Sequence, residues 1–237
     1  MQIKILKECG FEEAHLGLAL SFYDHKIPLV DWDYIDSKQH WGISSAREAP
    51  FSEENIFWTN ERFEKMKKLA IHIANKQVPE DYETRNNLAY ISAEQKFLEQ
   101  IDVWIFIQAS RDFWSEFDTY RVDMTKQSSS TMHTLSKRNV TIDDFEEGVT
   151  QYSIDALNHS INAFNEISYD DLYKNISTLK KNLPEAWLQE RIFKTSYKTL
   201  KWILEQRDGH RLESWKIFNK EIYNQIEHPE FIKPIEN

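Results

Sequence analysis

The segment from Ile101 to Gln108 restricts the possible folds of this chain more than any other stretch. Its residues, Ile-Asp-Val-Trp-Ile-Phe-Ile-Gln, are mostly β-branched or aromatic, which favours a buried β-strand. Residues 2–7 alternate well enough for a second, shorter strand. Most other periodic segments have the spacing of helices. We therefore expect a helix-rich α+β protein.

Apolar residues at helical spacing predict the remaining elements. Ser110 is expected to cap the helix that follows the strand, and Thr141 with its neighbouring acids to open another. Residues 24–60 are expected to form a long loop packed down by tryptophans, and the tail after Pro229 to be extended. A helix is also expected to close at Phe97–Glu99. The other expected helices are 12–23, 61–76, 111–121, 141–167, 169–183, 185–207 with a break near 195–196, and 212–226.

Composition narrows the class of protein. With 237 residues, 41% of them hydrophobic, and a mean hydropathy of −0.65, we expect one globular domain over residues 1–237 and no membrane segment. The single cysteine, Cys9, excludes an internal disulfide and suits a reducing cytoplasm, and the N-terminus lacks the pattern of a secretory signal. A net charge of −10 disfavours a general nucleic-acid binder, whereas a small anionic ligand needs only a local cationic pocket.

A run of hydroxyl side chains follows the helix expected at 111–121. Ser128 to Ser130 come directly after Gln127, with Lys126 beside them and Arg121 upstream. Serine hydroxyls and turn amides donate hydrogen bonds to phosphate oxygens while a cation supplies charge, so this stretch predicts an anion-binding loop. A polar surface turn is the alternative interpretation.

Two stretches carry motifs with a distinctive order of residues, and the first stretch runs from Leu98 to Met132. Glu99 precedes the predicted strand, residues 119–121 read Thr-Tyr-Arg, and residues 126–132 read Lys-Gln-Ser-Ser-Ser-Thr-Met. This order resembles the flavin-dependent thymidylate synthases. In that family a Leu-Glu-His corner is followed by a strand, a helix, an Arg-His-Arg triplet and Asn-Glu-x-Ser-Gly-Arg-Tyr, and the alignment needs no gap.

The second stretch runs from Lys180 to Arg207. Lys180 precedes Pro184 by four residues, residues 196–200 read Ser-Tyr-Lys-Thr-Leu, and Arg207 follows. The family pattern is an arginine four residues before a proline, then Asn-x-Arg-x-Leu, then an arginine, again aligned without a gap. The order and separation of the two stretches make the pair more specific than either alone.

The resemblance implies a fold, an assembly and a reaction. It implies a helix-rich single domain with a mixed sheet, assembled as a homotetramer that binds FAD and dUMP where subunits meet. In that family methylene tetrahydrofolate supplies a one-carbon unit and reduced FAD supplies the hydride. The sequence carries no motif for a resident metal ion.

The resemblance also implies roles for single residues. Arg207 matches the arginine that holds the uracil ring, where its donors would stabilise negative charge as C5 attacks, so it is the predicted catalytic residue. A helix C-terminal arginine that interacts with the dipole is the alternative. The predicted substrate contacts are Arg121, Gln127, Ser128, Ser129, Ser130, Lys180 and Arg207. The predicted FAD contacts are Glu99, Thr119, Tyr120, Arg121, Ser196, Lys198 and Arg211.

This chain departs from the family at several of these positions. Thr119, Tyr120 and Thr131 stand where the family has cationic or titratable residues, and Ser196 and Lys198 replace an asparagine and an arginine. Hydrogen bonds to charged groups contribute about 1.5–3 kcal/mol each, so these losses need replacement. The candidate replacements are Lys126, His133, Lys137, Arg138 and Arg211.

Three hypotheses follow from the sequence. The first is a divergent flavin-dependent thymidylate synthase-like enzyme acting on a pyrimidine deoxynucleotide. The second is a flavin-free protein of the same fold that senses or sequesters a nucleotide, which the altered triplet motivates. The third is an oligomeric interaction protein in which the serines form a surface turn.

Overall fold

The computed structural model describes residues 1–20, 60–75, 95–166 and 172–232. These residues belong to two compact units. Unit 1 comprises Met1–Lys7, Val103–Thr195 and Ile203–Ile226, and unit 2 comprises the described residues of Glu8–Asp102, Ser196–Trp202 and Glu227–Asn237. The loop expected at 24–60 lies outside the described residues, and a single domain over 1–237 stays a prediction.

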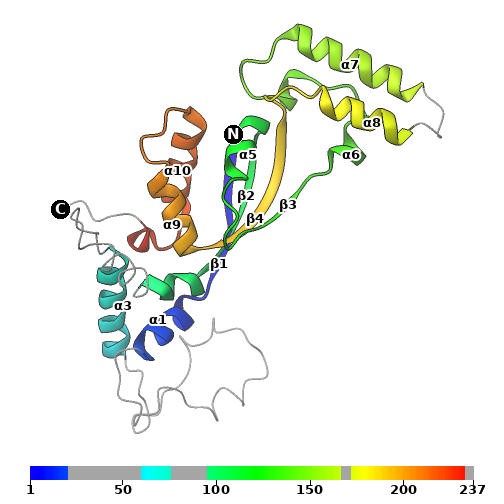
Figure 1. Ribbon diagram of the computed structural model, residues 1–237. Helices are drawn as coiled ribbons and strands as arrows, with labels where there is room; N and C mark the ends of the chain where they lie inside the picture. The colour runs from blue at the N-terminus through cyan, green and yellow to red at the C-terminus, as the bar shows by residue number, and fades with distance from the viewer. Residues whose placement is uncertain (21–59, 76–94, 167–171, 233–237) are drawn as a thin grey trace, which may run out of the picture. The chain divides into compact units, whose positions relative to one another are not determined.

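One four-stranded sheet organises the chain, in the order β1-β2-β4-β3. The strands are β1 (Gln2–Cys9), β2 (Asp102–Ser110), β3 (Thr125–Ser128) and β4 (Leu188–Ser196). Neighbouring strands run in opposite directions (Figure 1), and Thr125 pairs with Lys194 and Ser128 with Arg191 in the β3–β4 register. The α+β prediction is confirmed. The sheet is antiparallel rather than mixed. For example, the chain leaves β3 and enters β4 at the same end of the sheet, so these two strands run in opposite directions.

Helices account for most of the other described residues. The α-helices are α1 (Phe11–Leu20), α3 (Asn60–Ala74), α5 (Arg111–Phe117), α6 (Thr131–Thr134), α7 (Gln151–Asn165), α8 (Leu172–Lys181), α9 (Tyr197–Gln206) and α10 (Glu213–Gln225). Short 3-10 helices are η2 (Gln95–Gln100), η3 (Ile142–Asp144) and η5 (Pro229–Phe231). No described helix is long and apolar enough to cross a bilayer.

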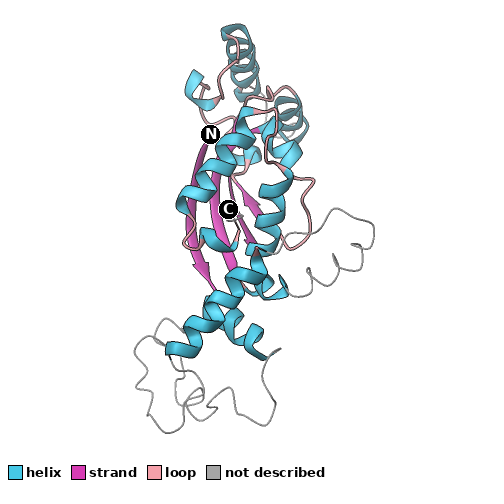
Figure 2. Cartoon of the chain, turned by 90° about the vertical axis from the view of Figure 1, so that its left-hand side faces the viewer, coloured by secondary structure: helices cyan, strands magenta, loops and turns pink. Residues whose placement is uncertain are grey.

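Aromatic rings fill the main core of unit 1. The ring centroid of Phe113 on α5 lies 4.8 Å from that of Trp215 on α10, and Phe117 lies 4.9 Å from Phe193 on β4. All four side chains are fully buried, and burial of one such ring contributes about 1.5–3 kcal/mol. In Figure 2, helices lie in front of the strands of the sheet. This packing fixes α5, on which the candidate site is built.

A second, smaller core in unit 1 joins α6, α7 and α8. Apolar side chains at helical spacing on α7, including Ile154, Leu157 and Ile161, face Ile176 and Leu179 of α8. This core supports the segment that connects β3 with β4.

The helix predicted over 185–207 is wrong in its first half. Leu188–Ser196 is strand β4, between β2 and β3, and only Tyr197–Gln206 is helical. Phe193 and Thr195 are buried, whereas Ile192 is exposed, so this part of the segment has the alternation of a strand. Pairing on both sides satisfies its backbone and overrides the apolar spacing that predicted a helix.

The helix predicted over 141–167 is interrupted in the structure. Thr141 does open a helical turn, in which the Asp144 side chain accepts from the Thr141 backbone N–H at 2.8 Å. Phe145 then forms a β-bridge with Trp187, and Gly148 adopts a φ of 105°. These features break the helix before α7.

Smaller corrections concern helix ends and loops. Ser110 occupies the N-cap position of α5, but its hydroxyl donates to Glu146 instead of capping the helix. The helix predicted over 111–121 ends at Phe117, and the start of the tail forms η5 rather than an extended chain. The stretch predicted as an anion loop is the edge strand β3 followed by α6.

Unit 2 contains a tight corner between β1 and α1. Gly10 has a φ of 97°, and a Cβ atom at this position would lie 2.1 Å from the backbone oxygen of Gln100. Only glycine fits this approach without displacing η2.

Candidate functional site

Arg207 lies directly after α9 and is held by side chains of unit 1. Its Nε donates to Tyr120 Oη at 2.7 Å and its Nη1 donates to Glu116 Oε2 at 3.1 Å. Nη1 also lies 2.9 Å from His210 Nε2. These bonds go to side chains rather than to the C-terminal carbonyls of α9, so the dipole interpretation of Arg207 does not describe its contacts.

Aromatic faces complete the surroundings of Arg207. Its guanidinium carbon lies 4.3 Å from the centre of the Trp215 ring and 5.4 Å from that of Tyr120. Trp215 Nε1 donates to the same Glu116 oxygen at 2.7 Å. The Arg207 side chain is 17% exposed and that of Glu116 is 34% exposed. The guanidinium is therefore fixed in a stacked position and still reaches solvent.

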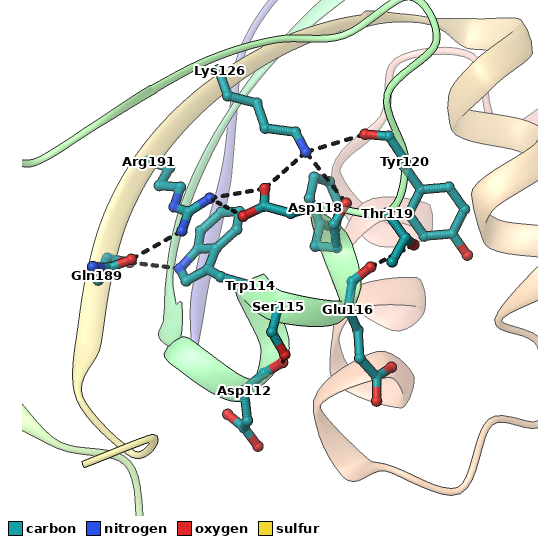
Figure 3. A network of polar contacts seen from close by, with 11 residues as sticks. Asp112, Trp114, Ser115, Glu116, Asp118, Thr119, Tyr120, Lys126, Gln189 and Arg191 are labelled. Carbon is teal, nitrogen blue, oxygen red and sulfur yellow. Dashed lines mark hydrogen bonds and ion pairs between the residues drawn. The ribbon is translucent and has the colours of Figure 1, made fainter. Parts of the chain in front are cut away.

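A second charged cluster lies beside α5 and is drawn in Figure 3. Arg191 on β4 donates from Nη1 to both carboxylate oxygens of Asp118 at 3.0 Å, and its guanidinium stacks on Trp114 at 4.2 Å. Lys126 on β3 donates to Asp118 Oδ1 at 3.0 Å and to the carbonyls of Phe117 and Tyr120 at 3.3 and 3.2 Å. This cluster joins the end of α5 to the β3–β4 edge.

The carboxyl of Asp118 is shifted by its partners. Burial alone would raise its pKa, but hydrogen bonds from Lys126 and Arg191, reinforced by their charges, outweigh burial and hold the pKa below its usual value. Lys126, proposed from the sequence as a replacement phosphate ligand, is thus occupied by Asp118 and by two carbonyls at the end of α5.

The hydroxyl run is exposed, but it is not one loop. Gln127 pairs with Ile192 and Ser128 with Arg191, so these neighbours project to opposite faces of the sheet. The backbone N–H of Ser129 donates to Glu190 O at 2.9 Å, and Ser130 occupies the N-cap position of α6. Ser129 and Ser130 at the strand end are exposed hydroxyls that can meet an anion.

The cations expected near the phosphate differ in their availability. Arg121 is exposed in the turn before β3, and Lys180 is half-buried in the last turn of α8. His133 and Lys137 are exposed. Arg138 makes a bidentate pair with Asp144, at 2.8 and 2.5 Å, and so faces its own chain.

Several positions predicted to contact FAD are engaged within the chain. In unit 1, Thr119 Oγ1 donates to Glu116 O at 2.7 Å, and Tyr120 is buried beneath Arg207. In unit 2, Glu99 pairs with Lys198 at 2.7 Å, and the buried Ser196 Oγ accepts from Thr199 N at 3.3 Å as an N-cap.

The structure thus brings together four of the predicted site residues as two pairs, Tyr120 with Arg207 and Glu99 with Lys198, although the sequence did not predict the pairing. Arg211 is exposed at the start of the segment that leads to α10.

Six residues of these clusters were not assigned to a site from the sequence. They are Trp114, Glu116, Asp118, Arg191, His210 and Trp215. Glu116 precedes Tyr120 by four residues on a predicted helix, which is a signal that the two side chains share a face. Trp215 was expected only as an apolar position of the last helix, and Arg191 lies in the segment whose strand was missed. The described residues hold no group of three or more His, Cys, Asp or Glu that could bind a metal.

Comparisons with known proteins identify the fold. No family model and no curated protein matches the sequence. A solved structure of the flavin-dependent thymidylate synthase ThyX from Helicobacter pylori, in complex with FAD and dUMP, matches with a TM-score of 0.60 and 12% identity over 98% of each chain. A second structure of ThyX from Helicobacter pylori with FAD and dUMP matches with a TM-score of 0.59 and 12% identity, over 98% of this chain and 97% of that one. At this identity the likeness concerns the fold, and it agrees with the resemblance of the motifs: this chain has the fold of the flavin-dependent thymidylate synthases.

Proposed function

We propose that this protein is a divergent flavin-dependent thymidylate synthase-like enzyme that binds a dUMP-type pyrimidine deoxynucleotide and transfers a one-carbon unit to C5. The observation that carries the proposal is Arg207, at the position that the family uses for the uracil ring. It is partly exposed and held rigid by Glu116, Tyr120 and Trp215. The similarity of the whole chain to a protein solved with FAD and dUMP supports the same substrate class.

Different residues of this chain would bind the base and the phosphate of the nucleotide. Arg207 would donate to a ring carbonyl oxygen and stabilise the negative charge on that oxygen in the enolate-like form of the ring, from which C5 attacks the one-carbon unit. Because stacking already fixes its guanidinium, little reorganisation would be needed. Gln127, Ser129 and Ser130 with Arg121 and Lys180 would hold the phosphate; Ser128 faces the Arg191 side of the sheet and would contribute less.

FAD fits some of the predicted positions better than others. Arg121 and Arg211 are exposed, so these cations would hold its phosphates. Lys198 is paired with Glu99. Tyr120 and Ser196 are committed to internal hydrogen bonds and would not hold these phosphates. Bound FAD in its reduced form would supply the hydride that completes a methyl group, and methylene tetrahydrofolate is the proposed one-carbon donor. We also propose a homotetramer and, from the single Cys9, a cytoplasmic location.

The reaction is tested by analysis of the nucleotide product. The protein is mixed with dUMP, methylene tetrahydrofolate and chemically reduced FAD, and mass spectrometry measures the methylated nucleotide. We expect Arg207→Ala to lower turnover by about 10²- to 10³-fold, as loss of one charge-stabilising donor does. Arg138→Ala, which removes a surface arginine paired with Asp144, is the matched control and should retain the rate. Full turnover in Arg207→Ala, or no product with the wild type, would reject the assignment.

A flavin-free nucleotide-binding protein is the second candidate. The observation that favours it is the internal use of Thr119, Tyr120, Ser196 and the Glu99–Lys198 pair, five of the seven positions predicted to contact FAD. In that case dUMP would bind through Arg207 and the serines without a cofactor.

A further inference from the structure

The strand β1 forms one edge of the sheet, and a side chain of α10 binds its backbone there. In the described sheet β1 comes first and pairs only with β2. The backbone N–H of Ile5 donates to Gln225 Oε1 at 3.2 Å, and Gln225 Nε2 donates to Ile3 O at 3.1 Å. All three residues belong to unit 1. One primary amide therefore binds a donor and an acceptor of the edge strand.

A third contact fixes the orientation of this amide. Gln225 Nε2 also donates to Glu221 Oε2 at 3.1 Å, one turn earlier on α10. If the amide were flipped, its oxygen would meet two acceptors, Ile3 O and Glu221 Oε2, and its NH2 group would meet the Ile5 N–H. The half-buried side chain of Gln225 is therefore held against β1 in one orientation.

The amide occupies groups that an added strand would need. Backbone groups of alternate strand residues point to opposite sides, so Ile3, Ile5 and Lys7 present theirs to the same edge. An edge of this kind pairs readily with an extended chain through main-chain hydrogen bonds. Because Gln225 binds Ile3 O and Ile5 N–H, such a chain would first have to displace its side chain.

The chain itself contains a segment that fits this edge, namely β1 of a second copy. Two β1 strands that pair antiparallel with Ile5 opposite Ile5 would place Ile3 opposite Lys7 and Lys4 opposite Leu6. Residues 3, 5 and 7 would then form the hydrogen-bonded pairs, in agreement with the direction of their backbone groups. No lysine would face another lysine, and the central pair is β-branched, so charge and side-chain packing both favour this register.

We propose that the edge of β1 is a strand-addition surface for β1 of a second copy, and that Gln225 keeps this surface closed. The inference goes beyond the proposed function and does not depend on it, because no residue of the candidate site takes part. While the Gln225 amide is in place, two of the backbone groups that the added strand requires are already bound.

The test removes the amide and measures association. Light scattering records the masses of the wild type and of Gln225→Ala over a range of protein concentrations. We expect Gln225→Ala to form a species of twice the wild-type mass at concentrations about 10-fold lower than the wild type requires, the value of one to two neutral hydrogen bonds. Hydrogen exchange should show added protection in that species at Lys7, whose backbone N–H faces the edge and does not bind Gln225. Asn224→Ala, which removes the neighbouring exposed amide of α10, is the matched control and should keep the wild-type masses.

The outcomes distinguish a closed surface from a support of α10. If Gln225→Ala loses stability but keeps the wild-type masses, Gln225 only anchors α10 and the inference is overturned. A heavier species without added protection at Lys7 would use another surface, and one whose mass is not a multiple of the wild-type mass would contain another partner; either result overturns the inference as well. If Gln225→Ala fails to fold, Gln225→Asn, whose amide is one methylene too short to reach both groups, carries the test.

Discussion

Asp118 and Glu116 lie two residues apart and serve different clusters. Asp118 receives two cations and joins the end of α5 to β3 and β4, whereas Glu116 orients Arg207 beside Trp215. Each carboxylate has its charge compensated, as partly buried charges require. At the scale of the residue, two neighbouring carboxylates therefore have different roles. Asp118 belongs to a cluster that supports the fold, and Glu116 belongs to the candidate site around Arg207.

The pairing of Asp118 predicts a pH dependence of stability. Its pKa is lowered in the folded protein, so its contribution is fully present above its unfolded pKa of about 3.9 and is lost as the pH falls through the lower, folded value. We expect Asp118→Asn to reduce the free energy of unfolding at pH 7 by about 1 kcal/mol, a low value because its side chain is 46% exposed to screening solvent.

Urea unfolding from pH 7 down to pH 2 measures this effect. The difference in the free energy of unfolding between the wild type and Asp118→Asn should begin to shrink below about pH 4 and vanish below the folded pKa of Asp118. Asp143→Asn, which removes an exposed carboxylate of η3, controls for the loss of a negative charge. A difference that stays constant to pH 2 would show that the ionised form of Asp118 is not what stabilises the fold.

Elements were predictable from the sequence where their pattern is local. β1 and β2 were expected from β-branched and alternating residues, α3 and α10 from helical spacing, and all four form within a few residues of their expected bounds. β4 was not, because its strand character comes from pairing with β2 and β3, which are far away in sequence. The candidate site divides in the same way: motif spacing predicts Arg207, which stays a prediction, but its partner Glu116 lies 91 residues away and could not be found from that spacing.

The corner between β1 and α1 gives a test at the scale of the element. Gly10→Ala should cost more than about 3 kcal/mol, because it combines a positive φ with a Cβ that would collide with Gln100 O. Gly148→Ala is a matched control, since its φ is 105° but no atom lies within 4 Å of the added Cβ. It should cost only the conformational penalty, about 1–3 kcal/mol.

Thermal unfolding followed by circular dichroism measures both variants. Equal losses of stability in Gly10→Ala and Gly148→Ala would mean that the close approach of η2 does not constrain the corner. A larger loss in Gly10→Ala would confirm that this approach, and not the dihedral alone, requires glycine.

At the scale of the whole molecule, the fold is shared although most of the sequence is not. The chain matches a structure from Helicobacter pylori over 98% of its length at 12% identity. Its hydrophobic core rests on patterns that many residues satisfy, whereas cofactor recognition depends on single side chains. We therefore expect cofactor binding to differ from that of the family at Thr119, Tyr120 and Ser196, which depart from the family motif.

Retention of flavin tests the central claim most directly. The purified protein is incubated with FAD and dUMP and gel filtered, and the visible absorbance spectrum and mass of the protein peak are recorded. The account predicts flavin absorbance bands in the protein peak, from FAD bound by Arg121 and Arg211, and the mass of a tetramer. A colourless protein peak that still carries dUMP would contradict flavin dependence and leave the flavin-free nucleotide-binding protein in its place.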